Sequence, residues 1–146
     1  MKRILLLFFI FSLYSNILPA QFETWQIGQT TLTGSMLVDD LEIPWEILYG
    51  PDDHLWVTER QGRVWRINEE TGDKQLVLDH VEQVTQDGTE PGMLGMAFHP
   101  DFESNQQLFI VYNWTDQNGN RWERLSSFEY LNQELTNENT ILDSIS

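Results

Sequence analysis

Residues 43–79 read IPWEILYGPDDHLWVTERQGRVWRINEETGDKQLVLD, which is a series of short apolar or alternating runs separated by turn residues. The separators are rich in glycine, proline and aspartate, residue types that preset or tolerate the backbone angles of turns. No dozen residues in this stretch keep a helical period. The stretch therefore predicts antiparallel strands joined in sequence order, over residues 43–49, 54–59, 63–68 and 74–79.

The pattern then recurs further along the chain. Tyr49-Gly50-Pro51-Asp52 is echoed by Phe98-His99-Pro100-Asp101, 49 positions later, and an apolar run follows each copy. Asn118-Gly119 adds a hairpin signal. We expect the strands of this second unit over residues 93–98, 108–113 and 121–130, with a short run at 140–142 that starts a fourth.

Self-similarity at this period, with four strands in each unit, is typical of a β-propeller blade. The predicted fold is all-β, with blade one at about 43–80 and blade two at about 92–146. A propeller closes as a ring, so two blades leave two sides uncovered, and residues 41–146 are expected to be a truncated propeller. A β-sandwich, or a short propeller completed by oligomerisation, remains an alternative.

The first twenty residues differ from the rest. Lys2 and Arg3 precede the apolar run Ile4–Leu13, and a more polar segment ends at Ala20. This order predicts a signal peptide over residues 1–20, and hence an exported, periplasmic or secreted chain with no membrane association after cleavage. An uncleaved anchor is the alternative, but the apolar run is shorter than the ~20 residues that span a bilayer. Residues 21–40 are expected to form a lead-in strand.

Composition limits the kinds of partner. The chain has 8 Lys and Arg against 23 Asp and Glu, a formal net charge of −15, and no cysteine. Such a surface repels phosphate backbones, which argues against nucleic acid, and it also promotes solubility. The absence of cysteine excludes disulfides, thiol nucleophiles and Cys-ligated metals.

Two segments carry a resemblance to a known family. Residues 87–102, DGTEPGMLGMAFHPDF, are similar to the Gly-Leu-Leu-Gly-x-Ala-x-His-Pro-Asp-Phe segment of soluble quinoprotein sugar dehydrogenases, the glucose/sorbosone dehydrogenase group. Residues 41–67 agree with the same family through Pro44-Trp45, Tyr49–Asp52 and Leu55–Arg60.

This resemblance implies a six-bladed propeller that binds pyrroloquinoline quinone (PQQ) and calcium in a central polar site. Such enzymes oxidise the anomeric hydroxyl of an aldose to a lactone, a histidine takes the hydroxyl proton, and an external acceptor receives the electrons. The family's catalytic histidine lies beyond this chain. We therefore expect an inactive N-terminal fragment with no catalytic or metal-binding residue of its own and with unassigned cofactor contacts. A non-catalytic propeller that binds a protein or a glycan is the alternative, because fold does not fix function.

Glu90 is the one candidate site residue. It stands two positions before Gly92, where the family has a glutamine that touches the substrate. A glutamine amide both donates and accepts hydrogen bonds, whereas an ionised carboxylate only accepts. Glu90 is therefore predicted either to contact the sugar differently or to be an exposed loop carboxylate.

The other polar and aromatic residues are expected to be structural. His99 is assigned to a strand-end turn, and His54 and His80 to the surface. Arg60 and Arg63 are expected to pair with Glu59 or Glu69, and residues 116–120 to form a hairpin turn rather than a calcium loop. Asn113-Trp114-Thr115 fits a glycosylation sequon at a strand end, which is a weak signal. The aromatic residues are expected to pack between blades; they are Trp45, Trp56, Trp65, Phe98, Phe109 and Trp114.

Overall fold

The computed structural model describes residues 23–86, 88 and 90–145, so the predicted signal peptide over residues 1–20 lies outside the described residues. Within them, no helix has the length and hydropathy needed to cross a membrane. Among the described residues, 23–36 form a unit separate from the rest. That unit contains a hairpin of strands β1 (Glu23–Ile27) and β2 (Thr30–Gly34), paired antiparallel.

This hairpin differs from the single lead-in strand expected over residues 21–40. The chain reverses at Gly28, which has a φ of 62°, a backbone conformation that glycine adopts at little cost. A two-residue connection with glycine in this conformation is typical of tight β-hairpins, and it closes the pair Ile27 and Thr30.

The first sheet contains four strands in sequence order, as the turn residues predicted. They are β3 (Pro44–Tyr49), β4 (His54–Glu59), β5 (Arg63–Asn68) and β6 (Lys74–Asp79). Every neighbouring pair is antiparallel. The strand bounds match the predicted runs closely because each run ends at a glycine- or aspartate-rich turn.

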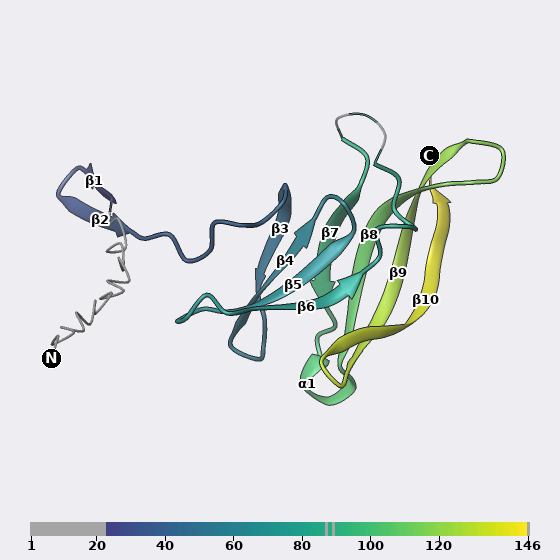
Figure 1. Cartoon of the computed structure of the whole chain (residues 1–146). Helices are drawn as coiled ribbons and strands as arrows, with labels where there is room; N and C mark the ends of the chain where they lie inside the picture. Colours follow the sequence, from purple (N-terminus) through teal and green to yellow (C-terminus); the bar gives the residue numbers. More distant parts are fainter. Residues whose placement is uncertain (1–22, 87, 89, 146) are drawn as a thin grey trace, which may run out of the picture. The chain divides into compact units, whose positions relative to one another are not determined.

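The second sheet repeats this order, and its last three strands are longer than those of the first sheet (Figure 1). It contains β7 (Met93–Phe98), β8 (Gln107–Thr115), β9 (Arg121–Leu131) and β10 (Glu134–Ile145), with the short helix α1 (Phe102–Asn105) between β7 and β8. The turn at Asp116–Asn120 joins β8 to β9, as predicted, and Asp116 N–H donates to the Asn120 carbonyl at 2.9 Å.

The last strand was under-predicted. A short run at 140–142 was expected, but β10 spans 12 residues and pairs with β9 from Glu134 onward. Its pairing shifts register at three places, and Asn137 and Ser144 have positive φ angles of 52° and 55°. These irregularities break the alternation of polar and apolar side chains that marks a regular strand.

The two sheets pack face to face. Strand β3 lies beside β7, and β6 lies beside β10. Thr58 in β4 donates its hydroxyl to the Leu94 carbonyl in β7 at 2.9 Å, which links the sheets directly. The shared core consists of large apolar side chains from both sheets, including Trp56, Met93, Leu108, Ile110 and Phe128.

Trp56 is the central ring of this core. It is fully buried, and its ring centroid lies 5.4 Å from Phe98, 6.2 Å from Phe102 and 5.0 Å from Tyr130, all in edge-on geometry. Its indole N–H donates to the Asp52 carboxylate at 3.0 Å. The ring is therefore packed on one side and hydrogen-bonded on the other, as buried tryptophans usually are.

Packing between blades is confirmed for three of the six aromatic residues, at the interface of the two sheets. Trp56, Phe98 and Trp114 belong to the core between the sheets or pack against it. Trp45 is 50% exposed, and Trp65 lies on the opposite face of the first sheet, where the ammonium of Lys74 sits over its ring. Phe109 contacts the His99 ring instead of the core.

Each sheet also has an uncovered side among the described residues. On the first sheet Ile47 is 61% exposed and Tyr49 is 55% exposed. On the second sheet Leu142 in β10 is 54% exposed. Apolar side chains at these positions form the kind of surface that a further sheet covers.

Candidate functional site

Glu90 lies in the loop between β6 and β7, beside a hollow of about 290 Å³ between the two sheets. The hollow is at the start of β3 and β7, where Trp45 and Leu94 contribute one wall. Asn113 at the end of β8 and Glu123 near the start of β9 contribute the other. Glu90 is exposed and borders the hollow.

The loop that carries Glu90 is held by Asn113. The Gly92 N–H donates to the Asn113 side-chain oxygen at 3.1 Å, and the Asn113 N–H donates to the Gly92 carbonyl at 2.9 Å. The Asn113 carbonyl accepts from the N–H of Thr85, midway along the loop, at 2.8 Å. Asn113 thus binds the loop at two places, and its side chain is already engaged at the sequon position.

Gly92 has no room for a side chain. A Cβ at this position would overlap the Cγ and the carbonyl oxygen of Arg60. The next residue, Met93, donates its N–H to that same carbonyl at 2.8 Å. The end of the loop is therefore fixed against Arg60, directly after β4, and this contact restricts the backbone two residues after Glu90.

The hollow carries two carboxylates, Glu90 and Glu123, and one amide, Asn113. A second hollow adjoins it through Pro91, Asn113 and Glu123 and adds Arg121 and Trp122. Carboxylates accept hydrogen bonds from hydroxyl groups, and the half-exposed Trp45 ring presents a flat apolar surface. This combination suits a ligand rich in hydroxyl groups.

The family model for glucose/sorbosone dehydrogenases matches residues 41–146. This chain belongs to the glucose/sorbosone dehydrogenase family. Quinoprotein glucose dehydrogenase B of Acinetobacter calcoaceticus is 38% identical over 93 residues, which are 63% of this chain and 19% of that protein. An uncharacterized protein of Synechocystis is 27% identical over 105 residues, which are 26% of its length.

Solved structures of sugar dehydrogenases share the fold. The PQQ-bound aldose sugar dehydrogenase of Streptomyces coelicolor superposes with a TM-score of 0.64 at 22% identity, over 86% of this chain and 35% of that one. The soluble aldose sugar dehydrogenase of Escherichia coli, in its apo-form, gives a TM-score of 0.65 at 23% identity, over 73% and 31%. The predicted all-β propeller class is confirmed, and the first and second sheets are its blades.

The chain spans about a fifth to a third of the length of these glucose/sorbosone dehydrogenase relatives. The residues of the hollow do not by themselves fit PQQ, because Glu90 and Glu123 place negative charge beside a ligand that carries carboxylates of its own. The described residues also contain no group of three or more His, Cys, Asp or Glu side chains arranged to hold a metal ion.

The assignment of His99 to a turn is correct. Its Nδ1 accepts from the Asp101 N–H at 3.0 Å and lies 2.9 Å from the Asn105 side-chain amide. Its carbonyl accepts from the Phe102 N–H, which starts α1. The ring therefore closes the turn after β7.

The assignment to the surface was wrong for His80, whereas His54 is partly exposed. His54 is half-buried, and its Nδ1 lies 3.0 Å from the Arg66 guanidinium. His80 is buried, because the rings of Tyr112 and Phe128 in the second sheet pack edge-on against it at 5.2 and 5.8 Å. Both contacts join residues far apart in the sequence, so a local pattern does not reveal them.

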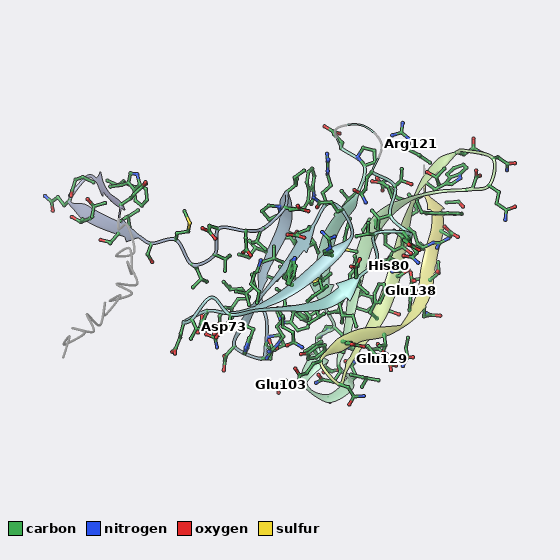
Figure 2. The ribbon with its side chains drawn as sticks, in the orientation of Figure 1. Asp73, His80, Glu103, Arg121, Glu129 and Glu138 are labelled. Atoms are coloured by element: carbon green, nitrogen blue, oxygen red, sulfur yellow. The ribbon has the colours of Figure 1, made fainter. Side chains whose placement is uncertain are left out.

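The sequence analysis also missed a polar cluster around Glu138, a residue of β10. One Glu138 carboxylate oxygen accepts hydrogen bonds from the hydroxyls of Tyr112 and Ser126, both at 2.6 Å. The other lies 3.4 Å from the His80 Nε2, close enough for attraction but not aligned as a hydrogen bond. Figure 2 shows His80 and Glu138 next to each other between the two sheets. Tyr112 and Ser126 are fully buried, whereas Glu138 is exposed, so the cluster joins two buried hydroxyls to a carboxylate that water also reaches.

The charge pairing was predicted in part. The Arg63 guanidinium lies 3.9 Å from Glu59, as expected, and also 3.3 Å from Glu42. Glu69 instead accepts a hydrogen bond from the Tyr49 hydroxyl at 3.1 Å. Neither arginine flanking the β4–β5 turn lines the Glu90 hollow.

Proposed function

We propose that this chain is part of an exported quinoprotein oxidoreductase, periplasmic or secreted, that oxidises the anomeric hydroxyl of aldose sugars to lactones. The observation that carries the proposal is the family match over residues 41–146, together with 38% identity to a quinoprotein glucose dehydrogenase. In this proposal bound PQQ would supply the redox chemistry, calcium would be the bound metal ion beside it, and an external acceptor would take the electrons.

In this proposal the two blades contribute the Glu90 hollow to the sugar-binding site of that enzyme. The catalytic histidine and the groups that hold the cofactors belong to the remaining blades of a six-bladed ring. Residues 41–146 alone are then inactive, although they supply one wall of the substrate site. This division is supported by the share of the relatives' length that the chain covers.

Glu90 accepts a hydrogen bond from a sugar hydroxyl in this proposal. The Asn113 clamp and the side-chain-free Gly92 hold its loop at the mouth of the hollow. Trp45 supplies a flat ring beside it, half exposed and free to stack on the apolar face of a pyranose.

The test is an activity assay on the whole protein that contains this chain. Expressed with calcium and PQQ, it should reduce a dye when supplied with at least one aldose from a panel. Glu90→Gln should change KM by roughly three- to tenfold, the size of one exposed hydrogen bond to a charged group. Glu82→Gln, which removes an exposed carboxylate outside the hollow, is the matched control. If none of the aldoses in the panel leads to reduction of the dye, the proposal is overturned.

A further inference from the structure

A second groove lies at the other end of strands β3 and β7, between the two repeated turns. It has a volume of about 660 Å³ and is lined by residues 49–51, 53 and 98–104. The Glu90 hollow involves the start of these strands, whereas this turn groove lies beyond their ends at Tyr49 and Phe98. The two sites are roughly four strand residues apart, about 13 Å. The turn groove is therefore separate from the site proposed for sugar.

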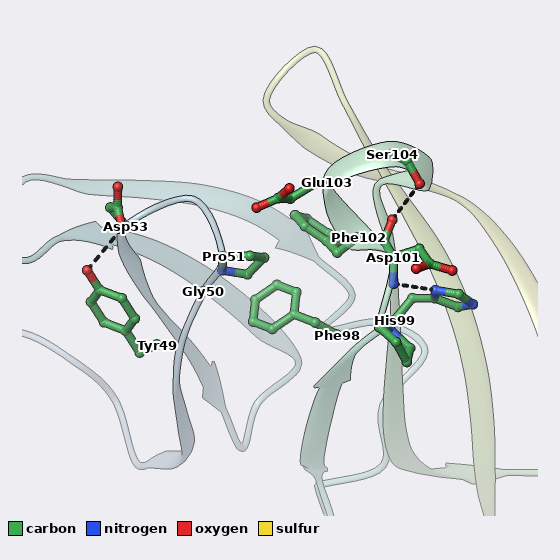
Figure 3. Close-up of a pocket in the computed structure, with 11 residues that line it drawn as sticks. Tyr49, Gly50, Pro51, Asp53, Phe98, His99, Asp101, Phe102, Glu103 and Ser104 are labelled. Atoms are coloured by element: carbon green, nitrogen blue, oxygen red, sulfur yellow. Dashed lines mark hydrogen bonds between the residues drawn. The ribbon is translucent and has the colours of Figure 1, made fainter.

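The floor of the turn groove is apolar. Figure 3 shows Pro51 of the first turn beside the ring of Phe98, with Phe102 of α1 next to them. The Phe98 and Phe102 rings lie 4.8 Å apart in edge-on geometry, and Phe102 is almost fully buried. These side chains are fixed by the core behind them, so the floor is formed before any ligand arrives.

The rim of the turn groove is acidic. Asp53 stands on the first turn, and Asp101 and Glu103 stand on the second. Among the described residues, no hydrogen bond or ion pair involves the carboxylates of Asp101 and Glu103. None of the described residues that line the groove is a lysine or an arginine.

The nearby cation and phenol do not offset this negative charge. The guanidinium of Arg66 donates to the Asp52 carboxylate at 2.6 Å, which balances its charge within the first turn. Removal from water and the carboxylates of Glu69 and Asp53 raise the pKa of Tyr49 to about 12, so its hydroxyl stays protonated. An approaching positive charge therefore meets the rim carboxylates without competition from the protein.

We infer that the turn groove is a docking site for a lysine- or arginine-bearing segment of a partner protein. The carboxylates stand on both turns with an apolar floor between them, so a segment with alternating basic and apolar side chains meets both features. Basic side chains pair with the rim, and their neighbours cover Pro51, Phe98 and Phe102. The volume is within the range of about 300–1,000 Å³ typical of ligand pockets. Electrostatic complementarity of this kind directs both encounter and orientation.

The test measures binding of a synthetic peptide of Lys-Leu-Pro repeats to the full chain by calorimetry, at physiological salt to screen diffuse attraction. Saturable binding is expected, and a peptide with glutamine in place of every lysine should not bind. The double variant Asp101→Asn/Glu103→Gln should weaken binding about fivefold, the effect of losing two exposed ion pairs. Neither substitution removes a hydrogen bond among the described residues, so the variant should fold, which circular dichroism checks.

The matched control is Asp39→Asn/Glu82→Gln, which removes the same two charges from exposed positions outside the groove. Binding by this control should equal that of the parent chain. Equal weakening by both double variants shows attraction to the acidic chain as a whole and overturns the inference. Absence of saturable peptide binding overturns it too, as does equal or tighter binding of spermine or of a neutral oligosaccharide. None of these outcomes depends on sugar oxidation, so the proposed function is tested separately.

Discussion

The interface between the two sheets has two unlike ends. Near the repeated turns it is a cluster of aromatic rings around Trp56. Near the Glu90 loop it is a polar cluster in which Glu138 accepts from Tyr112 and Ser126 and faces His80. The aromatic end depends on burial and close packing, whereas the polar end depends on every buried group keeping its partner. Stability should therefore respond to side-chain volume at one end and to protonation at the other.

The largest effect is expected from Trp56→Ala at the aromatic end. Removing this fully buried ring leaves a cavity among Phe98, Phe102 and Tyr130, which should cost about 3–5 kcal/mol of the free energy of unfolding. Urea denaturation followed by circular dichroism measures the loss. Trp25→Ala, in the separate hairpin unit, should leave the unfolding of the two sheets unchanged. Equal losses in both variants contradict a core centred on Trp56.

A smaller loss is expected from Glu138→Ala at the polar end. Tyr112 and Ser126 are fully buried, and each loses its acceptor, at a cost of about 1–3 kcal/mol. The same denaturation experiment applies. Glu134→Ala on the same strand removes an exposed carboxylate and should change stability by no more than about 0.5 kcal/mol. If Glu138→Ala lowers the free energy of unfolding no more than Glu134→Ala does, the hydroxyls of Tyr112 and Ser126 have found other hydrogen-bond acceptors.

Mild acid should weaken the polar end through His80. Burial lowers the pKa of His80 below its ordinary 6.5; Arg124 lowers it further, while Glu138 and Asp79 oppose the shift. The unfolded chain then binds the proton more readily than the folded chain, so stability is complete above pH 6.5 and decreases as the pH falls below it. Unfolding midpoints at pH 7.5 and 5.5 should differ in the parent chain. The difference between the two midpoints should shrink in His80→Gln. If it is as large in His80→Gln as in the parent chain, His80 is not the group that weakens the fold in acid.

The smallest effect on stability is expected on the uncovered sides. Ile47 and Leu142 are mostly exposed, so Ile47→Thr/Leu142→Thr should change the free energy of unfolding by about 0.5 kcal/mol or less. The chain without residues 1–20 should nevertheless bind a hydrophobic dye such as ANS or self-associate, because of its exposed apolar surface. The double variant should bind less dye. A parent chain that stays monomeric and binds no dye contradicts the prediction.

The sequence predicted the elements whose limits are set by local chemistry. The first sheet follows its turn residues almost residue by residue, and His99 acts in the turn to which it was assigned. The repeated turn also pointed to two sheets of one kind. By contrast, most of β10 is polar, with only Leu135 buried, so its extent is set by pairing with β9 rather than by its own pattern.

The site was predictable only in part for the same reason. Glu90 was singled out by its place in a motif, and it does border a hollow. The clamp by Asn113 and the burial of His80 arise from contacts between residues 21 or more positions apart, which no local pattern encodes. The apolar floor of the turn groove depends on α1, whose four residues are too few to give a helical period.

The two copies of the repeated turn have come to use their aspartates differently. Asp52 is committed to architecture, since its oxygens accept from Trp56 and Arg66. Asp101 occupies the corresponding place in the second copy. There the His99 ring stabilises the turn through the Asp101 N–H and the Asn105 amide, and the Asp101 carboxylate forms no hydrogen bond among the described residues. The carboxylate at position 101 can therefore be changed without removing a hydrogen bond among the described residues, whereas a change at Asp52 would remove two.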